Sequence, residues 1–165
     1  MSTSQENVPS WLQLRELFFE ILPSLLAEAQ EARKAAVSYR NFRVGCAALA
    51  FHTQKGIWEV FRGANFKEAV NARPICAEPV AIQAARAKGF DLIVGLVIVG
   101  EPQLDEDSGA LLSTLTPCAE CRRKLLELPA VRMQTIIVTV TPNLKTQEVR
   151  TFHGVLEAHH WDQRW

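Results

Sequence analysis

The chain has 165 residues, of which 48% are hydrophobic, so it fits one compact domain with a sizeable core. Lys and Arg together number 18, as do Asp and Glu, and this zero net charge argues against a protein that binds nucleic acid through a basic surface. Because the N-terminus lacks the pattern of a signal peptide and the longest apolar run, residues 92–99, is too short to cross a bilayer, we expect a cytoplasmic protein without membrane contact.

The N-terminal part of the chain predicts a helix or a helix pair. Ser10 and Gln13 form a potential capping box, and apolar residues at helical spacing continue the pattern to about Val37. Pro23 interrupts this pattern, so we expect either a kink or a second helix that begins at the proline. The residues at helical spacing are Trp11, Leu14, Phe18, Leu22, Leu25 and Ala29.

The middle of the chain alternates between predicted strands and a helix. Val44–Phe51 is small and apolar and predicts a buried strand, with Ile57–Arg62 as its hairpin partner across a turn at residues 52–56. Ala77–Lys88 is rich in alanine and is followed by Gly89, which is typical of the end of a helix.

The alternation continues in the C-terminal half. Leu92–Val99 predicts a buried strand, and the polar residues 101–116 have no regular period and predict a loop near the site. Cys118–Leu128 predicts a helix that ends before Pro129, and Thr135–Val140 predicts another buried strand. Alternating strands and helices with nearly continuous apolar strands imply an α/β fold whose sheet is covered on both faces.

Three cysteines and one glutamate suggest a catalytic metal site. Cys118 and Cys121 open one predicted helix, and Cys76 opens another, where the helix dipole and free N–H groups favour thiolates. Three protein ligands leave the fourth tetrahedral position to water, as in catalytic zinc sites. Glu78 follows Cys76 closely enough to contact that water without binding the metal.

Two simpler interpretations remain open for these residues. Cys46 could be a fourth ligand of a closed, structural zinc site, although it lies within a predicted core strand, where a free cysteine usually behaves as a small apolar residue. Glu78 alone could be an acid that the helix dipole favours in a first turn. Its position beside Cys76 and the later Pro117-Cys118-x-x-Cys121 favours the catalytic interpretation.

The composite of Cys76-Ala-Glu78 with Pro117-Cys118-x-x-Cys121 resembles the cytidine deaminase family of zinc enzymes. Other segments agree with the same family over roughly residues 24–140, whereas residues 1–22 and 141–165 are not covered. These segments are Tyr39-x-x-Phe42-x-Val44-Gly45-x-Ala47-Ala48-Leu49, Gly63-x-Asn65 and Cys121-Arg122. The resemblance implies a single three-layer α/β/α sandwich with a mixed sheet of about five strands.

The resemblance also implies an activity and a set of substrate contacts. The chain would bind one Zn²⁺ and hydrolytically deaminate a small nucleoside-like substrate in pyrimidine salvage, as a homotetramer. Glu78 would take a proton from water, deliver it to the ring nitrogen, and then protonate the leaving amine. Phe42 and Asn65 would contact the substrate, the Ala77 backbone would hold the pyrimidine edge, and the Thr116 carbonyl would orient the amine. A core aromatic and a turn residue are nearly equal alternatives for Phe42 and Asn65.

The chain departs from the family pattern at three positions. Pro79 stands where the family has an arginine that offsets the negative charge of the three thiolates. Blasticidin S deaminases also lack this arginine. Arg122 and the helix N-termini could supply the positive charge in its place. Lys67 replaces the sugar-binding glutamate, and the nearest acid is Glu68. A local bulge could bring Glu68 into the vacant position, or Lys67 could point to solvent. Asn71 replaces a tyrosine.

The aromatic residues of the tail predict packing, and the histidines outside the motif predict surface positions. Family enzymes cover the base with a C-terminal phenylalanine of another subunit, so Phe152 is also a candidate for that role. The other aromatic residues and histidines of the tail are His153, His159, His160, Trp161 and Trp165.

Three functional classes remain open. The first is a deaminase of cytidine, deoxycytidine or an analogue, and the second is a deaminase of another aminated heterocycle such as a nucleoside antibiotic or modified base. The third is an inactive zinc-stabilised binding protein, and retention of Glu78 argues against it.

Overall fold

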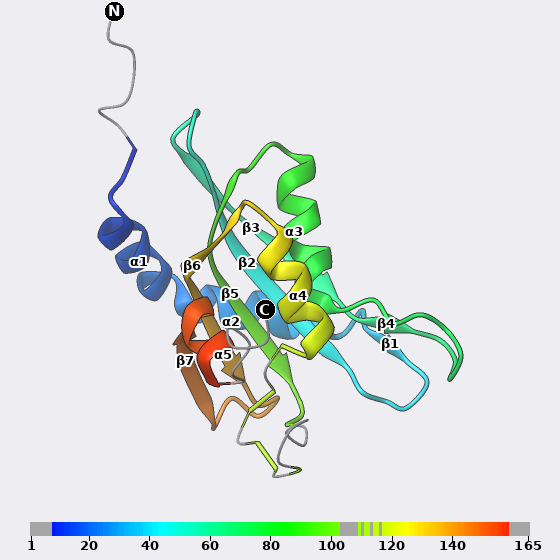
Figure 1. Ribbon diagram of the computed structural model, residues 1–165. Helices are drawn as coiled ribbons and strands as arrows, with labels where there is room; N and C mark the ends of the chain where they lie inside the picture. The colour runs from blue at the N-terminus through cyan, green and yellow to red at the C-terminus, as the bar shows by residue number, and fades with distance from the viewer. Residues whose placement is uncertain (1–7, 103–108, 110, 113, 116, 159–165) are drawn as a thin grey trace, which may run out of the picture.

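The computed structural model of the protein describes residues 8–102, 109, 111–112, 114–115 and 117–158. Its centre is a five-stranded sheet with the order β3-β2-β5-β6-β7 (Figure 1). The pairing of β5 with β6 is parallel and the other pairings are antiparallel, so the sheet is mixed as predicted. The strands are β2 (Val44–His52), β3 (Ile57–Ala64), β5 (Leu92–Gly100), β6 (Val131–Val140) and β7 (Gln147–Thr151).

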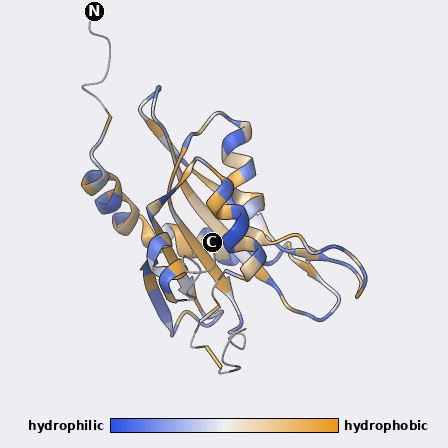
Figure 2. Cartoon of the chain, in the orientation of Figure 1, coloured by the Kyte–Doolittle hydropathy of each residue, from blue (hydrophilic) through white to orange (hydrophobic). Residues whose placement is uncertain are grey.

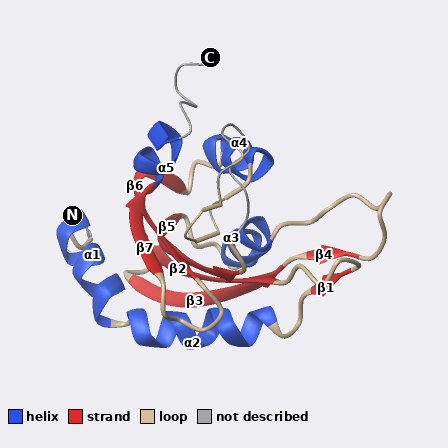
Figure 3. Cartoon of the chain, turned by 90° about the horizontal axis from the view of Figure 1, so that it is seen from below, coloured by secondary structure: helices blue, strands red, loops and turns tan. Residues whose placement is uncertain are grey.

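Helices cover both faces of this sheet (Figure 3). The helices α1 (Trp11–Glu20) and α2 (Leu22–Arg33) pack on one face. The other face carries α3 (Ala77–Ala87), α4 (Ala119–Glu127) and α5 (Phe152–Ala158). The predicted three-layer α/β/α sandwich is therefore confirmed. None of the helices within the described ranges is long and apolar enough to cross a membrane.

The central strands are apolar along their whole length because both of their faces are buried. In β2, Cys46 and Ala48 face the core under α3–α5, whereas Ala47 and Leu49 face the core under α1 and α2. The edge strand β7 is hydrophilic by contrast, as its blue colour beside the apolar β6 shows (Figure 2). The small residues of β2 allow helices to approach closely on both faces.

The N-terminal helices follow the sequence pattern except at their end. The backbone N–H of Gln13 donates to Ser10 Oγ at 3.2 Å, and the backbone N–H of Ser10 donates to the side-chain Oε1 of Gln13 at 2.8 Å. These two bonds complete the capping box. Pro23 lies in the first turn of α2, so it starts a second helix. The predicted end near Val37 is wrong: α2 ends at Arg33, and the Val37 N–H instead donates to the Asn65 carbonyl at 3.0 Å.

An arm that the sequence pattern did not predict projects from the body of the molecule. Its two strands, β1 (Val37–Ser38) and β4 (Phe66–Lys67), pair in parallel, and Phe66 also forms a bridge with Ile75 (Figures 1 and 3). Strands of two residues are too short to show a period. The arm matters because it carries one wall of the cavity described below.

The tail also contains structure that was not predicted, namely β7 and α5. Phe152 opens α5 and is fully buried in the core, which confirms packing and excludes Phe152 as a cover for another subunit's base. His153 is exposed on α5, as expected. His159, His160, Trp161 and Trp165 lie outside the described residues.

Candidate active site

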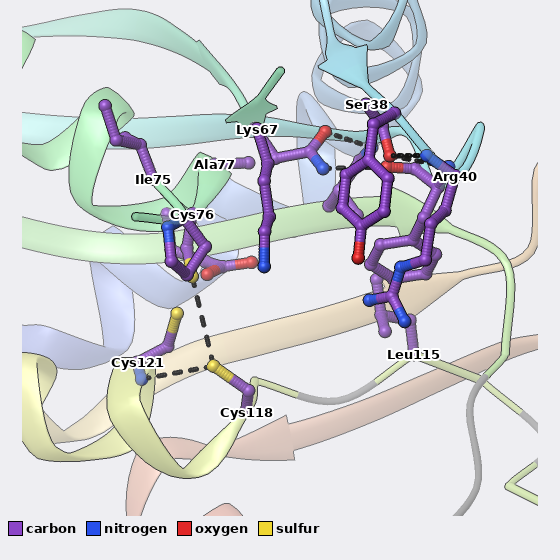
Figure 4. A pocket seen from close by; sticks show the side chains of 15 residues that line it. Ser38, Arg40, Lys67, Ile75, Cys76, Ala77, Leu115, Cys118 and Cys121 are labelled. Atoms are coloured by element: carbon purple, nitrogen blue, oxygen red, sulfur yellow. Dashed lines mark hydrogen bonds between the residues drawn. The ribbon is translucent and has the colours of Figure 1, made fainter. Parts of the chain in front are cut away.

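Two helix N-termini on the same face of the sheet present the three candidate ligands. Cys76 is the N-cap of α3, and Cys118 is the N-cap of α4. The Cys118 sulfur accepts a hydrogen bond from the Cys121 N–H at 3.4 Å and lies 3.9 Å from the Cys76 sulfur. The three sulfurs lie within 4.8 Å of one another and face each other across a small gap (Figure 4).

The spacing of these sulfurs fits a tetrahedral zinc ion. Zn–S bonds of about 2.3 Å at tetrahedral angles place two sulfurs roughly 3.8 Å apart. The distance between Cys76 and Cys118 agrees with this value. Cys46 is buried in β2 and does not join the group of potential metal ligands within the described ranges. The three cysteines are therefore positioned to hold one zinc ion, and Cys46 does not complete a closed four-thiolate site within the part of the chain described.

The electrostatics of the cluster favour a bound cation. Hydrogen bonds from the Cys121 and Cys76 side chains lower the pKa of the Cys118 thiol. The same contact with Cys118 is the main cause that raises the pKa of Cys76 and of Cys121. Without a metal, these contacts thus stabilise the thiolate of Cys118 and disfavour ionisation of the Cys76 and Cys121 thiols. A divalent cation that replaces the thiol protons allows all three sulfurs to ionise together.

Glu78 lies in the first turn of α3, beside the sulfurs, and only 4% of it is exposed. Burial is the largest cause that raises the pKa of its carboxyl group to about 6. Glu78 is not part of the potential ligand group, but it lines the same cavity as the three cysteines. A carboxyl group in this position can accept a proton from water and release it again near neutral pH.

A cavity of about 210 Å³ leads to these residues (Figure 4). Its buried end holds Glu78 and the three sulfurs, and its more exposed end is formed largely by the arm. The described lining residues are Ser38, Tyr39, Arg40, Phe42, Val44, Asn65, Lys67, Pro74, Ile75, Cys76, Ala77, Glu78, Leu115, Cys118 and Cys121. Buried polar groups at one end and an open mouth at the other suit a small molecule that enters with one end first.

The structure brings most of the substrate-binding candidates to this cavity. Phe42, Asn65 and Ala77 line it. Glu68 is exposed and is not among its lining residues, whereas its neighbour Lys67 is. The local bulge that would bring Glu68 into the site is therefore absent from the described structure. Thr116 lies outside the described residues.

Asn65 has a structural function that was only partly anticipated. Its Oδ1 accepts a hydrogen bond from the Val44 N–H, and its Nδ2 donates to the Phe42 carbonyl, both at 2.8 Å. The side chain thus fixes the segment that carries Phe42 into the cavity. An amide nitrogen has two hydrogens, so one N–H remains to contact a substrate. The two interpretations of Asn65, as a turn residue and as a substrate contact, are compatible.

Gly63 explains how α3 comes so close to the sheet. A Cβ atom at this position would lie 2.3 Å from the Ala77 carbonyl oxygen and 2.5 Å from the Ala81 nitrogen. Only glycine leaves room for the first turn of α3, which follows Cys76 and contains Glu78. The Gly63-x-Asn65 motif therefore positions both the metal site and the cavity wall.

Arg122 lies in α4 directly after Cys121, and its side chain turns back to the residue before Cys118. Its side chain is 2% exposed, and its Nη1 donates to the Pro117 carbonyl at 2.7 Å. Pro79 provides no charge at the position where the arginine was expected. The buried guanidinium of Arg122 thus places a positive charge on the Pro117 carbonyl, immediately before Cys118 in the turn that opens α4.

The sequence pattern indicated no cavity position for Tyr39 or Arg40, whereas Lys67 stood out as the replacement of a sugar-binding acid. Tyr39, Arg40 and Lys67 line the mouth of the cavity, and they belong to the arm. Asn71 is exposed in the loop of the arm and does not line the cavity.

Comparison with known proteins identifies the family. Residues 20–141 match the model of the cytidine and deoxycytidylate deaminase zinc-binding region. The cytidine deaminase from Burkholderia pseudomallei is 27% identical, with a TM-score of 0.61 over 80% of this chain and 93% of that one. The enzyme from Mycobacterium leprae is 27% identical, with a TM-score of 0.57 over 82% and 96%. The enzyme from Mycobacterium tuberculosis is 26% identical, with a TM-score of 0.52 over 70% and 82%.

Proposed function

The chain belongs to the family defined by the cytidine and deoxycytidylate deaminase zinc-binding region, and we propose that it is a hydrolytic deaminase of a cytosine-type nucleoside. The observation that carries this proposal is the buried carboxyl group of Glu78 beside three convergent cysteine sulfurs, at the closed end of a cavity. The reaction converts the cytosine form of the substrate and water to the uracil form and ammonia.

The zinc ion, when bound by Cys76, Cys118 and Cys121, supplies a Lewis acid that acidifies water. Glu78 accepts a proton from that water and transfers it to the ring nitrogen of the base, which makes the amine-bearing carbon more electrophilic. The oxygen of the water then forms a bond to this carbon. Glu78 then accepts the remaining proton of the added hydroxyl group and passes it to the amine, the carbon–nitrogen bond breaks, and ammonia leaves. A carboxyl pKa near neutrality suits a group that both accepts and donates.

The cavity walls would orient the base for this transfer. We propose that Phe42 packs against the ring, that the Ala77 backbone and Glu78 hold its polar edge, and that Asn65 contacts the sugar. The contact of the Thr116 carbonyl with the leaving amine remains part of the proposal, because Thr116 is not described. The position of Phe42, Asn65, Ala77 and Glu78 around one cavity supports a substrate of nucleoside size.

A second candidate function is the deamination of another aminated heterocycle or an unusual nucleoside. Lys67 favours it, because a lysine can only donate a hydrogen bond where the family's acid accepts one from a sugar hydroxyl. The inactive binding protein is disfavoured by Glu78. A buried carboxyl group with a raised pKa costs stability, and a protein without catalytic need has no reason to retain it.

We also propose a homotetramer that acts in pyrimidine salvage in the cytoplasm. Several apolar side chains of the arm are exposed, and association of copies would cover such a surface. Sedimentation of the purified protein tests the assembly: a mass of four chains is expected, and a mass of one chain would contradict it. The exposed residues are Val37, Phe66, Val70 and Ile75.

The activity is tested by incubation of the zinc-loaded protein with cytidine, deoxycytidine and other cytosine-containing compounds. Ultraviolet absorbance and released ammonia are followed together. Equimolar ammonia and uracil-type product from at least one compound are expected. Absence of both from every compound would refute the proposed function.

A further inference from the structure

Two cations flank one aromatic ring at the mouth of the cavity. Lys67 Nζ lies 5.4 Å from the centroid of the Tyr39 ring, and Arg40 Cζ lies 5.3 Å from it. All three residues line the cavity. Contacts of this kind hold a cationic side chain in one region without removing its ability to donate hydrogen bonds.

The backbone of the arm fixes this arrangement. Lys67 in β4 is the register partner of Ser38 in β1, and the Tyr39 N–H donates to the Lys67 carbonyl at 2.9 Å. The side chains of Lys67 and Arg40 extend in the same direction, toward the side on which Cys118 lies (Figure 4). Lys67 and Arg40 therefore belong to a cavity wall whose backbone is held by the pairing of β1 with β4.

The charge of these two side chains is not balanced within the described structure. Other surface cations, including Arg62 and Lys88, form ion pairs with glutamates, whereas no described carboxylate pairs with Lys67 or Arg40. Among the described lining residues, Glu78 is the sole carboxylic acid, and it lies at the buried end. The described part of the cavity mouth thus offers two positive charges to a molecule that enters.

We propose that the substrate carries an oxyanion, either a carboxylate or a phosphate, on or beyond its sugar, and that Lys67 and Arg40 bind it. This inference rests on the proposed function: with the base at Glu78 and the sulfurs, the rest of the substrate extends toward the arm. An oxyanion accepts hydrogen bonds from both cations, and such charge-assisted bonds are stronger than those to a neutral hydroxyl. The fork of an arginine also matches carboxylate and phosphate oxygens.

Two pairs of compounds test the inference by turnover. Cytidine is compared with cytidine 5′-monophosphate, and cytidine 5′-carboxamide is compared with the 5′-carboxylate of the same size. We expect the anionic member of at least one pair to have a kcat/KM about tenfold higher, and the preferred pair identifies the oxyanion. The preference should fall in Lys67→Gln and Arg40→Gln, reverse in Lys67→Glu, and remain in Lys55→Gln, a control in the exposed turn between β2 and β3.

Calorimetric binding of reaction products separates this inference from the proposed function. The zinc-loaded protein is titrated with uridine, uridine 5′-monophosphate and uridine 5′-carboxylate. Tighter binding of an anionic product that depends on Lys67 would support the inference even if no cytosine compound is deaminated, which would refute the proposed function alone. Turnover and binding of neutral compounds equal to or better than those of both anionic ones would overturn the inference and leave deamination intact.

Discussion

The sulfur atoms of Cys76 and Cys118 lie 3.9 Å apart, although 42 positions separate the two residues in the chain. Each cysteine is the N-cap of a helix, and both helices pack on the same face of the sheet. The zinc site is thus created by the packing of α3 and α4, and its integrity depends on every contact that places these helix ends.

We predict one zinc per chain, lost in Cys121→Ser and retained in Cys46→Ala. Cys121 completes the ligand group, whereas Cys46 is a buried core residue outside it. Cys46→Ala should reduce stability modestly, by about 1 kcal/mol, because it removes one buried atom from a packed core. Metal analysis of chelator-free preparations measures the stoichiometry. A value near zero in the native protein, or zinc loss in Cys46→Ala equal to that in Cys121→Ser, would count against a three-cysteine site.

Gly63→Ala should disturb the metal site from outside it. The added Cβ would collide with the Ala77 carbonyl and push away the start of α3, so we expect a loss of about 1–3 kcal/mol in stability and weaker zinc retention. Urea unfolding and transfer of zinc to a chromogenic chelator measure the two effects.

Gly45→Ala is the matched control for that experiment. Its Cβ would lie 2.0 Å from the Ala29 carbonyl oxygen, so it overpacks α2 on the opposite face of the sheet. It should destabilise the fold while the folded fraction keeps its zinc. Zinc retention that falls equally in both variants would show that Gly63 has no particular effect on the site.

Arg122→Met should lower both stability and kcat. The substitution keeps much of the apolar stem but leaves the Pro117 carbonyl without its donor, at a cost of about 1–3 kcal/mol. It also removes a positive charge from the turn that carries Cys118, so we expect the site to become less able to acidify water. Arg122→Lys should retain more of the kcat because it keeps the charge, and the exposed Arg123→Met is the control. Wild-type kcat in folded, zinc-loaded Arg122→Met would contradict this function of Arg122.

The parts of the molecule that could be predicted from the sequence are those whose residue pattern follows from a local requirement, such as burial, helix termination or metal binding. The strands β2 and β5 were predictable because both of their faces are buried, and α3 because an apolar face is followed by Gly89, whose φ is +86°. The zinc ligands were predictable because Cys76 and the later Cys-x-x-Cys are required by the chemistry. The arm was not predictable, because β1 and β4 are held by pairing between distant segments and have no period of their own.

The mouth of the cavity could be located only in the folded structure. Lys67 stands out in the sequence as a departure from a motif, but nothing there indicates that Arg40 and Tyr39 lie beside it. The role of Asn65 as a brace for residues 42–44 also depends on a contact across 21 positions or more. Tertiary contacts of this kind determine specificity, whereas the motif determines the chemistry.

The most direct test of the central claim compares the zinc-loaded protein with Glu78→Gln in an assay of ammonia release from cytosine-type nucleosides and their 5′-phosphates. Glutamine keeps the size of the side chain but cannot carry the proton. We predict that the native protein releases ammonia, and that kcat in Glu78→Gln falls by about 10²–10⁴-fold with one zinc per chain still bound. Turnover similar to that of the native protein in zinc-loaded Glu78→Gln would contradict proton transfer by Glu78.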